Sequence, residues 1–216
     1  VRWRHPELGL VFPGSFIQLA EDTGLVEGIG AWVLRAACRQ MRTWLAEGLP
    51  PLRVAVNMSA KEISTSPLTE QIGATLAETG LDPGLLEIEI TEGSVVTNLD
   101  AAVSTLRAVK ALGVTLALDD FGTGYSSLKH LRRFPIDRLK LDGSFIRQIA
   151  DDETDRAIAR AAIELGHGLK LAVCAEGVET PAQLGFLRAN GCDAYQGHLF
   201  AAALPPAEFA GLLRGG

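Results

Sequence analysis

Short apolar segments alternate with helical patterns along most of this chain of 216 residues. The apolar segments are rich in valine, isoleucine and leucine, as in strands buried on both faces. A repeated order of strand and helix is typical of an α/β fold with a parallel sheet. Six strands are predicted, at Leu52–Met58, Leu85–Thr91, Val114–Leu118, Arg138–Leu141, Leu171–Ala175 and Ala194–Tyr195. Helices are predicted near Pro13–Thr23, Ile29–Glu47, Thr69–Thr79, Leu99–Leu112, Ser126–Arg133, Thr154–His167, Pro181–Ala189 and Pro206–Leu213.

A polar side chain marks the carboxyl end of each predicted strand. The adjacent pair Asp119 and Asp120 follows Val114–Leu118 and precedes a glycine-rich turn. The other strands end at or near Asn57, Glu89, Lys140 with Asp142, Glu176 and Gln196. An open sheet concentrates its site at one switch point, whereas a closed barrel brings all strand ends to one mouth. The distribution therefore favours a TIM-like (β/α)8 barrel.

The length of the chain indicates that this barrel is incomplete at its N-terminus. A typical barrel of this kind has about 250 residues, and one strand-helix unit takes about 30 or more. The composition, with 47% hydrophobic residues, is sufficient for one sizeable core. We therefore expect a single domain over residues 1–216 that lacks an amino-terminal piece of the barrel.

The pair Asp119 and Asp120 has two interpretations. Two adjacent carboxylates at the end of a buried strand repel each other and attract a cation, which indicates a metal site. Alternatively, one of them caps the next helix and the other is solvated. Because the other predicted strands also end in polar residues, we favour the metal site.

The charge and the cysteines limit the class of protein. A net charge of −6 disfavours binding of long nucleic acid, so a small anionic ligand would need metal ions or placed cations. The longest apolar segments have the length of strands, which predicts neither a transmembrane helix nor membrane contact. Cys38, Cys174 and Cys192 are odd in number and form no Cys-x-x-Cys pair. They predict core cysteines in a reducing, cytoplasmic protein.

A resemblance to a known family rests on motifs spread over the whole chain. They are Arg2-Trp3-Arg4-His5-Pro6, Val56-Asn57-Met58-Ser59, Glu89-Ile90-Thr91-Glu92, Asp119-Asp120-Phe121-Gly122-Thr123-Gly124-Tyr125, Leu139-Lys140-Leu141-Asp142, Ala175-Glu176-Gly177-Val178-Glu179 and Gln196-Gly197-His198-Leu199-Phe200. With these motifs the chain resembles the EAL domain, a bacterial phosphodiesterase that linearises cyclic di-GMP, from Val1 to about Phe209. In that family the Glu-Ala-Leu signature stands directly before the residues that match Val1-Arg2-Trp3. Its glutamate is absent from the sequence as given, which agrees with a truncated domain.

The resemblance implies a role for each candidate residue. Asn57, Glu89 and Asp119 would hold one ion together with the signature glutamate, and Asp119 and Asp120 would hold a second ion. Oxygen ligands of this kind suit Mg²⁺ or Mn²⁺ better than zinc, and two such ions can activate water and neutralise a phosphate. Lys140 would hold the attacking water or a phosphate oxygen, and Glu176 would act as general base. Arg2 and Gln196 would contact the ligand. Glu92 and Glu179 would support the loops at the mouth of the barrel. A metal-bound hydroxide that needs no separate base is the alternative for Glu176.

Two functions follow from the resemblance. The first is metal-dependent hydrolysis of cyclic di-GMP to the linear dinucleotide pGpG. The second is a catalytically inactive receptor for cyclic di-GMP or a regulatory protein-interaction module. The family often pairs its domains as homodimers and often joins them to sensory or GGDEF domains. His198, Ala202 and Ala203 depart from the family pattern near the last loop, where an aromatic, a basic and a proline residue are usual.

Overall fold

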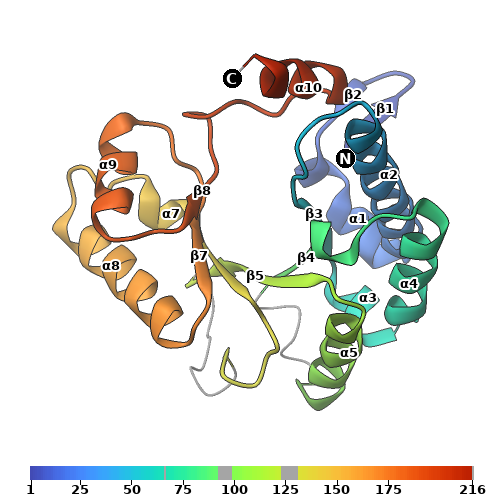
Figure 1. Cartoon of the computed structure of the whole chain (residues 1–216), viewed down its shortest axis with the longest axis horizontal. Coiled ribbons are helices and arrows are strands. Elements are labelled where there is room, and N and C mark those ends of the chain that lie inside the picture. The colour runs from blue at the N-terminus through green and yellow to red at the C-terminus, as the bar shows by residue number, and fades with distance from the viewer. Residues whose placement is uncertain (66, 92–98, 123–130, 216) are drawn as a thin grey trace.

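A curled parallel sheet forms the centre of the computed structural model, which describes residues 1–65, 67–91, 99–122 and 131–215 (Figure 1). Its 6 strands are hydrogen-bonded in the order of the sequence, each to the next. They are β3 (Val54–Met58), β4 (Leu86–Thr91), β5 (Thr115–Phe121), β6 (Arg138–Leu141), β7 (Ala172–Ala175) and β8 (Ala194–Tyr195). The prediction of an α/β fold with a TIM-like curled sheet is confirmed.

The two faces of the sheet differ in chemistry because successive strand residues point to opposite sides. On β4, Leu86, Ile88 and Ile90 are completely buried in the main hydrophobic core. Glu87 and Glu89 alternate with them and are also buried. The apolar residues therefore face the helices, and the carboxylates face the concave side of the sheet.

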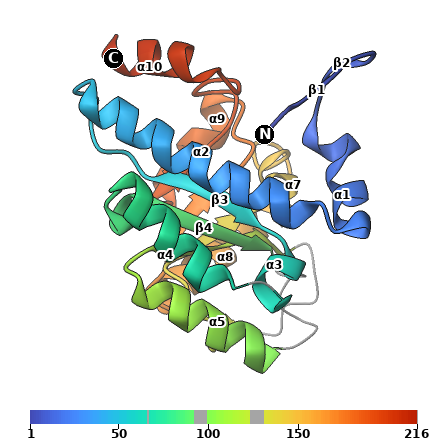
Figure 2. The ribbon, with the colours of Figure 1, turned by 90° about the vertical axis from the view of Figure 1, so that its right-hand side faces the viewer.

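Helices cover the convex side of the sheet (Figure 2). The long helix α2 crosses the ribbon in this view, with α4 and α5 beside it, and buries Leu34, Cys38 and Met41. The longer helices are α1 (Ile17–Thr23), α2 (Val26–Ala46), α4 (Leu68–Thr79), α5 (Leu99–Ala111), α8 (Glu153–Gly168), α9 (Pro181–Ala189) and α10 (Pro206–Arg214). Among the described residues, none of the helices combines the length and the apolar character needed to cross a bilayer.

Several short elements were not predicted from the sequence. Strands β1 (Trp3–His5) and β2 (Gly9–Val11) form an antiparallel hairpin, and short helices occur at α3 (Ala60–Thr65) and α7 (Gly143–Ile146). Pro13–Ser15 form a 3-10 turn, so α1 begins at Ile17. The predicted helix Ser126–Arg133 lies largely outside the described residues.

Helix α10 returns to the beginning of the fold and packs near the end of α2. The rings of Trp44 and Phe209 have centroids 5.3 Å apart. The Arg214 guanidinium donates a hydrogen bond of 2.6 Å to the Glu47 carboxylate. The C-terminal helix thus closes the molecule against α2, above the sheet in the view of Figure 2.

The cysteines fit the prediction of core residues without disulfides. All three are free, Cys38 and Cys174 are buried, and Cys192 is partly buried. Burial raises the pKa of the Cys38 thiol to about 11 and that of the Cys174 thiol to about 12. Both thiols are therefore protonated and unreactive near neutral pH.

Two glycines of α2 provide a test of packing at the β3 edge. A Cβ at Gly30 would lie 1.8 Å from Oε1 of the buried Glu62, whereas a Cβ at Gly28 has no atom within 4 Å. Gly30→Ala should lower the free energy of unfolding by about 1–3 kcal/mol through overpacking. Gly28→Ala should raise it by about 0.5–1 kcal/mol through helix propensity. Urea unfolding of both variants checks this, and equal effects would contradict the packing.

Candidate metal centre

Four acidic side chains meet at the carboxyl ends of the strands, and we call them the acidic cluster: Glu89, Asp119, Asp120 and Glu176. Parallel pairing places Asn57 opposite Glu89 and Thr91 opposite Asp119. Glu176 follows β7, and its backbone N–H donates to the Leu141 carbonyl of β6 over 3.0 Å. The structure therefore brings these side chains from successive strand ends together.

Lys140 holds three members of the acidic cluster together. Its Nζ lies 2.7 Å from Oε1 of Glu89, 3.0 Å from Oδ1 of Asp119 and 2.6 Å from Oε1 of Glu176. The Lys140 side chain is only 4% exposed. A buried ammonium with three charged acceptors is well compensated, whereas a lone one would lose its proton.

The electrostatics of this group follow from burial and pairing. Burial raises the pKa of Glu89 and of Glu176, and the nearby carboxylates raise it further. The Lys140 ammonium acts in the opposite direction, but the net pKa of both groups stays above the ordinary value. Burial alone would lower the pKa of Lys140, but Glu89 and Glu176 raise it above its ordinary value. Lys140 therefore stays charged, and the cluster has more negative charge than one ammonium can balance.

An irregularity in β5 brings the adjacent residues Asp119 and Asp120 to one place. The sequence predicted both after the strand, but β5 continues through them to Phe121. In a regular strand their side chains would point to opposite faces. Asp120 instead has a φ of 54°, and the pairing of β5 with β6 shifts register between Leu118 and Phe121. Such a bulge re-aims a side chain, and aspartate tolerates the left-handed conformation better than most residues.

The cluster fits a divalent cation. One carboxylate oxygen each from Asp119, Asp120 and Glu176 lie within 4.8 Å of one another. Burial and the neighbouring carboxylates of Asp119 and Asp142 raise the pKa of Asp120, and the Lys140 ammonium opposes the rise. An all-oxygen set of this kind suits hard cations. Glu176, predicted as a general base, thus lies where it could also be a ligand.

Asn57 lies beside the cluster on the neighbouring strand. Its side chain is exposed and lines a groove of about 640 Å³ along β3, together with Ser59 and Thr91. Register pairing puts it directly opposite Glu89, so the amide oxygen and the carboxylate share one end of the sheet. This position is consistent with the role predicted for Asn57.

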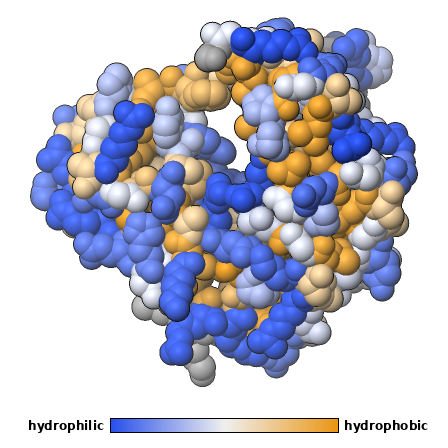
Figure 3. All heavy atoms as spheres, viewed as in Figure 1, coloured by the Kyte–Doolittle hydropathy of each residue, from blue (hydrophilic) through white to orange (hydrophobic). Residues whose placement is uncertain are grey.

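Gln196 and Glu179 lie at the rim of a second hollow. This hollow has a volume of about 790 Å³, and Arg53, Tyr195, His198 and other residues also line it. The space-filling view is open below α10, the helix that contributes Phe209 and Leu213 to the lining (Figure 3). Both Gln196 and Glu179 are exposed. They lie on loops after β8 and β7, at the same end of the sheet as the acidic cluster.

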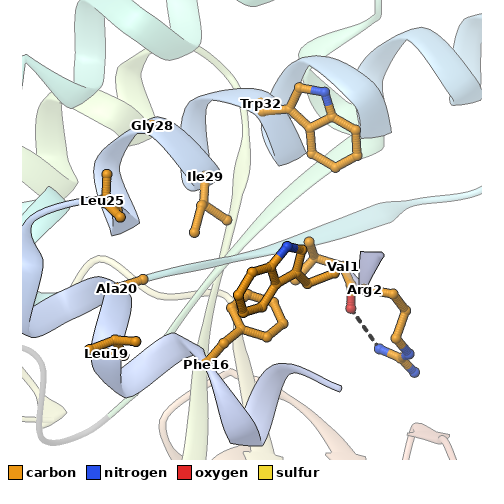
Figure 4. Close-up of a pocket in the computed structure, with 10 residues that line it drawn as sticks. Val1, Arg2, Phe16, Leu19, Ala20, Leu25, Gly28, Ile29 and Trp32 are labelled. Atoms are coloured by element: carbon orange, nitrogen blue, oxygen red, sulfur yellow. Dashed lines mark hydrogen bonds between the residues drawn. The ribbon is translucent and has the colours of Figure 1, made fainter. Parts of the chain in front are cut away.

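Arg2 is separated from these groups in the structure. Its guanidinium donates to the Val1 carbonyl over 2.8 Å and lies 4.6 Å from the ring centroid of Phe12. Within the described residues it has no contact with the acidic cluster. Figure 4 shows Arg2 at the edge of an apolar pocket of about 530 Å³, with Phe16 and Trp32 among its walls. Glu92, the predicted loop support, lies outside the described residues.

A charged layer beneath the acidic cluster was missed in the sequence. The buried Glu87 lies 3.5 Å from Arg53 and 3.4 Å from Arg138, measured from its Oε2 to the guanidinium nitrogens. Glu87 and Arg138 stand two residues before Glu89 and Lys140 on the same strands, so they point to the same concave side. Their position two residues before Glu89 and Lys140 was the sequence signal that would have placed Glu87 and Arg138 on the concave side.

Comparison with known proteins gives a consistent result. The family model of the EAL domain matches residues 1–203. The chain is 47% identical over 214 residues to the cyclic di-GMP phosphodiesterase NbdA of Pseudomonas aeruginosa, covering 99% of this chain and 27% of that protein. It is 45% identical over 205 residues to the bifunctional diguanylate cyclase/cyclic di-GMP phosphodiesterase MucR of the same organism, covering 95% and 30%. The chain therefore spans less than a third of the length of either relative.

A solved structure is similar as well. The PaMucR phosphodiesterase in complex with c-di-GMP superposes with a TM-score of 0.92 at 44% identity, covering 96% of this chain and 84% of that one.

Removal of the Lys140 charge tests the role of the ammonium. Lys140→Met should lower the free energy of unfolding of the metal-free protein by about 3–5 kcal/mol at pH 8, because two buried carboxylates and the partly buried Glu176 lose their counterion. Arg39→Met removes an exposed ion pair with Glu78 and should cost less than about 1 kcal/mol. Urea unfolding in EDTA measures both. Equal losses would show that Lys140 is not the counterion that stabilises the cluster.

Proposed function

The chain belongs to the EAL domain family, and from this premise we propose that it hydrolyses cyclic di-GMP to the linear dinucleotide pGpG with two Mg²⁺ or Mn²⁺ ions. The observation that carries the proposal is the meeting of Asp119, Asp120 and Glu176 beside a buried lysine at the carboxyl end of a parallel sheet. This is the end at which barrel enzymes have their active sites. The named activities of NbdA and MucR support the same reaction.

The metal ligands in this proposal come from three strands and one loop. Asn57, Glu89, Asp119 and Asp120 would hold the ions, and Glu176 lies close enough to contribute. When bound, the ions would lower the pKa of water and neutralise charge on the phosphate. The oxygen-only ligand set is the reason to prefer Mg²⁺ or Mn²⁺ to zinc.

Lys140 and Glu176 have separate roles in the proposed reaction. Water attacks phosphorus, the bond from phosphorus to the 3′ oxygen breaks, and Glu176 accepts the proton of the water. The 3′ oxygen leaves with the bonding electrons and takes up a proton from solvent to become the 3′ hydroxyl of pGpG. A carboxylate whose pKa is raised by burial is a stronger base than a solvated one. Lys140 stays protonated, so its N–H groups can hold the attacking water or a phosphate oxygen.

The remaining contacts belong to the ligand and the surrounding loops. We assign Arg2 and Gln196 to the ligand, and Glu92 and Glu179 to support of the loops at the mouth. Arg2 would have to approach from the hairpin that precedes α1. For the whole protein, a cytoplasmic location, a homodimer and a fused sensory or GGDEF domain remain part of the proposal.

A hydrolysis assay tests the function. Purified protein with Mg²⁺ or Mn²⁺ should convert cyclic di-GMP to pGpG, and EDTA should abolish the conversion. The assay should compare residues 1–216 with a chain that includes any residues before Val1 in the gene. Ligand binding without turnover in both would contradict the proposal and favour a receptor.

The role of Glu176 has its own prediction. Glu176→Gln should lower kcat by about 10²–10⁴-fold and leave cyclic di-GMP binding nearly unchanged, because the amide cannot accept the proton. Glu164→Gln on the exposed face of α8 is the matched control and should retain full activity. Product formation by chromatography and binding by calorimetry give the two readouts. A Glu176→Gln protein with the activity of the control would exclude a general base at this position.

A further inference from the structure

Gln183 is a buried polar side chain that the proposed reaction does not use. It lies in the first turn of α9 and is only 4% exposed. Its Oε1 accepts the backbone N–H of Glu179 over 2.7 Å and that of Thr180 over 2.9 Å. Its Nε2 donates to the backbone carbonyl of Arg147 over 3.2 Å. One amide therefore connects the loop after β7 with the end of α7.

The loop after β7 carries Glu176 and is fixed by hydrogen bonds in its first half. Glu176 N–H donates to Leu141 O over 3.0 Å, and Val178 N–H donates to Gln196 O over 3.1 Å. The next two N–H groups, of Glu179 and Thr180, donate to Gln183. Gln183 thus holds the second half of the segment that presents Glu176.

The segment after β6 that follows Lys140 is fixed from the same side. Asp142 caps α7, and Arg147 ends it. A Cβ built at Gly177 would lie 3.2 Å from Cα of Gly143, so the backbones of the two loops are in close contact. Gln183 joins the same two loops at their far ends through Arg147. Beyond the hydrogen bonds that pair β6 with β7, the loops after these two strands are therefore connected at two places: at Gly143 and Gly177, and through Gln183.

A helix cap alone does not require glutamine at this position. Thr180 and Gln183 form a capping box, in which the side chain at position 183 only accepts hydrogen bonds. A glutamate would accept the same bonds. The donor bond to Arg147 O is specific to the amide, because a carboxylate oxygen there would face a carbonyl oxygen.

We infer that Gln183 is a positioning residue that sets the place of the Glu176 carboxylate relative to Lys140 and Asp119 by tying the loop after β7 to α7. The inference rests on the proposed function and deepens it. Outer partners of a metal site typically change metal affinity or activity by about 10–100-fold when they are replaced. Because Gln183 acts through the backbone, we expect the lower end of this range.

The isosteric variant Gln183→Glu separates the helix-capping role of Gln183 from its role in tying the loop to α7. At pH 8 it should keep the cap and lose the bond to Arg147 O. We expect kcat to fall about tenfold with KM unchanged. The affinity for Mn²⁺, measured by electron paramagnetic resonance without substrate, should weaken. Amide hydrogen exchange over residues 176–180 should become faster. Thr180→Ala is the matched control. It removes the capping hydroxyl and leaves the Arg147 bond, so its Tm should fall while kcat and Mn²⁺ affinity stay at the wild-type values.

The outcomes distinguish the inference from the proposed function. Gln183→Glu with wild-type kcat, Mn²⁺ affinity and exchange would overturn the inference. If Gln183→Glu does not fold, Gln183→Met fills the space with an apolar chain and should show the same losses, since water can reach the exposed Glu179 and Thr180. A wild-type protein without turnover would refute the proposed function, and Mn²⁺ affinity and hydrogen exchange would still decide the role of Gln183.

Discussion

One buried ammonium group allows the acidic side chains of this sheet to lie together. Lys140 contacts Glu89, Asp119 and Glu176 at 2.6 to 3.0 Å, in a position that water barely reaches. Without it, parallel strands would bring like charges into one place at a cost that the surrounding apolar core could hardly offset. The layer below follows the same rule, since Glu87 lies between Arg53 and Arg138. Paired charge on the concave side thus coexists with an apolar convex side.

The bulge at Asp120 is a second feature that shapes the site. A strand alternates its side chains, so two consecutive aspartates on one strand cannot normally serve one ion. The left-handed Asp120 and the shift in the β5–β6 register break this alternation and bring both carboxylates to the side of Glu176. The cost of this backbone conformation is of order 1–3 kcal/mol. Strain of this kind at the mouth of a barrel is common where chemistry takes place.

The sequence predicted those parts of the fold that depend on local pattern. Strands such as β4 were evident because residues 86–91 are apolar or β-branched at every second position and buried on both faces. The meeting of Glu89, Asp119 and Glu176 followed from parallel topology alone. The hairpin at residues 3–11 was missed because its strands are short and mostly exposed, so no burial pattern marks them. Gln183 was missed because its partner Arg147 is 36 residues away, and no spacing rule relates a helix N-terminus to a distant carbonyl.

The order of the sheet also determines how the chain can assemble. Every strand from β3 to β8 pairs with its neighbour in the sequence, so each new strand finds its partner already in place. Parallel strands joined by crossover helices pair slowly, but domains generally fold from the N-terminal side during synthesis. Helix α10 packs against a surface formed early in the chain, since Arg214 and Glu47 are 167 residues apart. On the ribosome, the sheet can therefore grow strand by strand, and the flank of α2 around Trp44 is covered only after α10 has emerged.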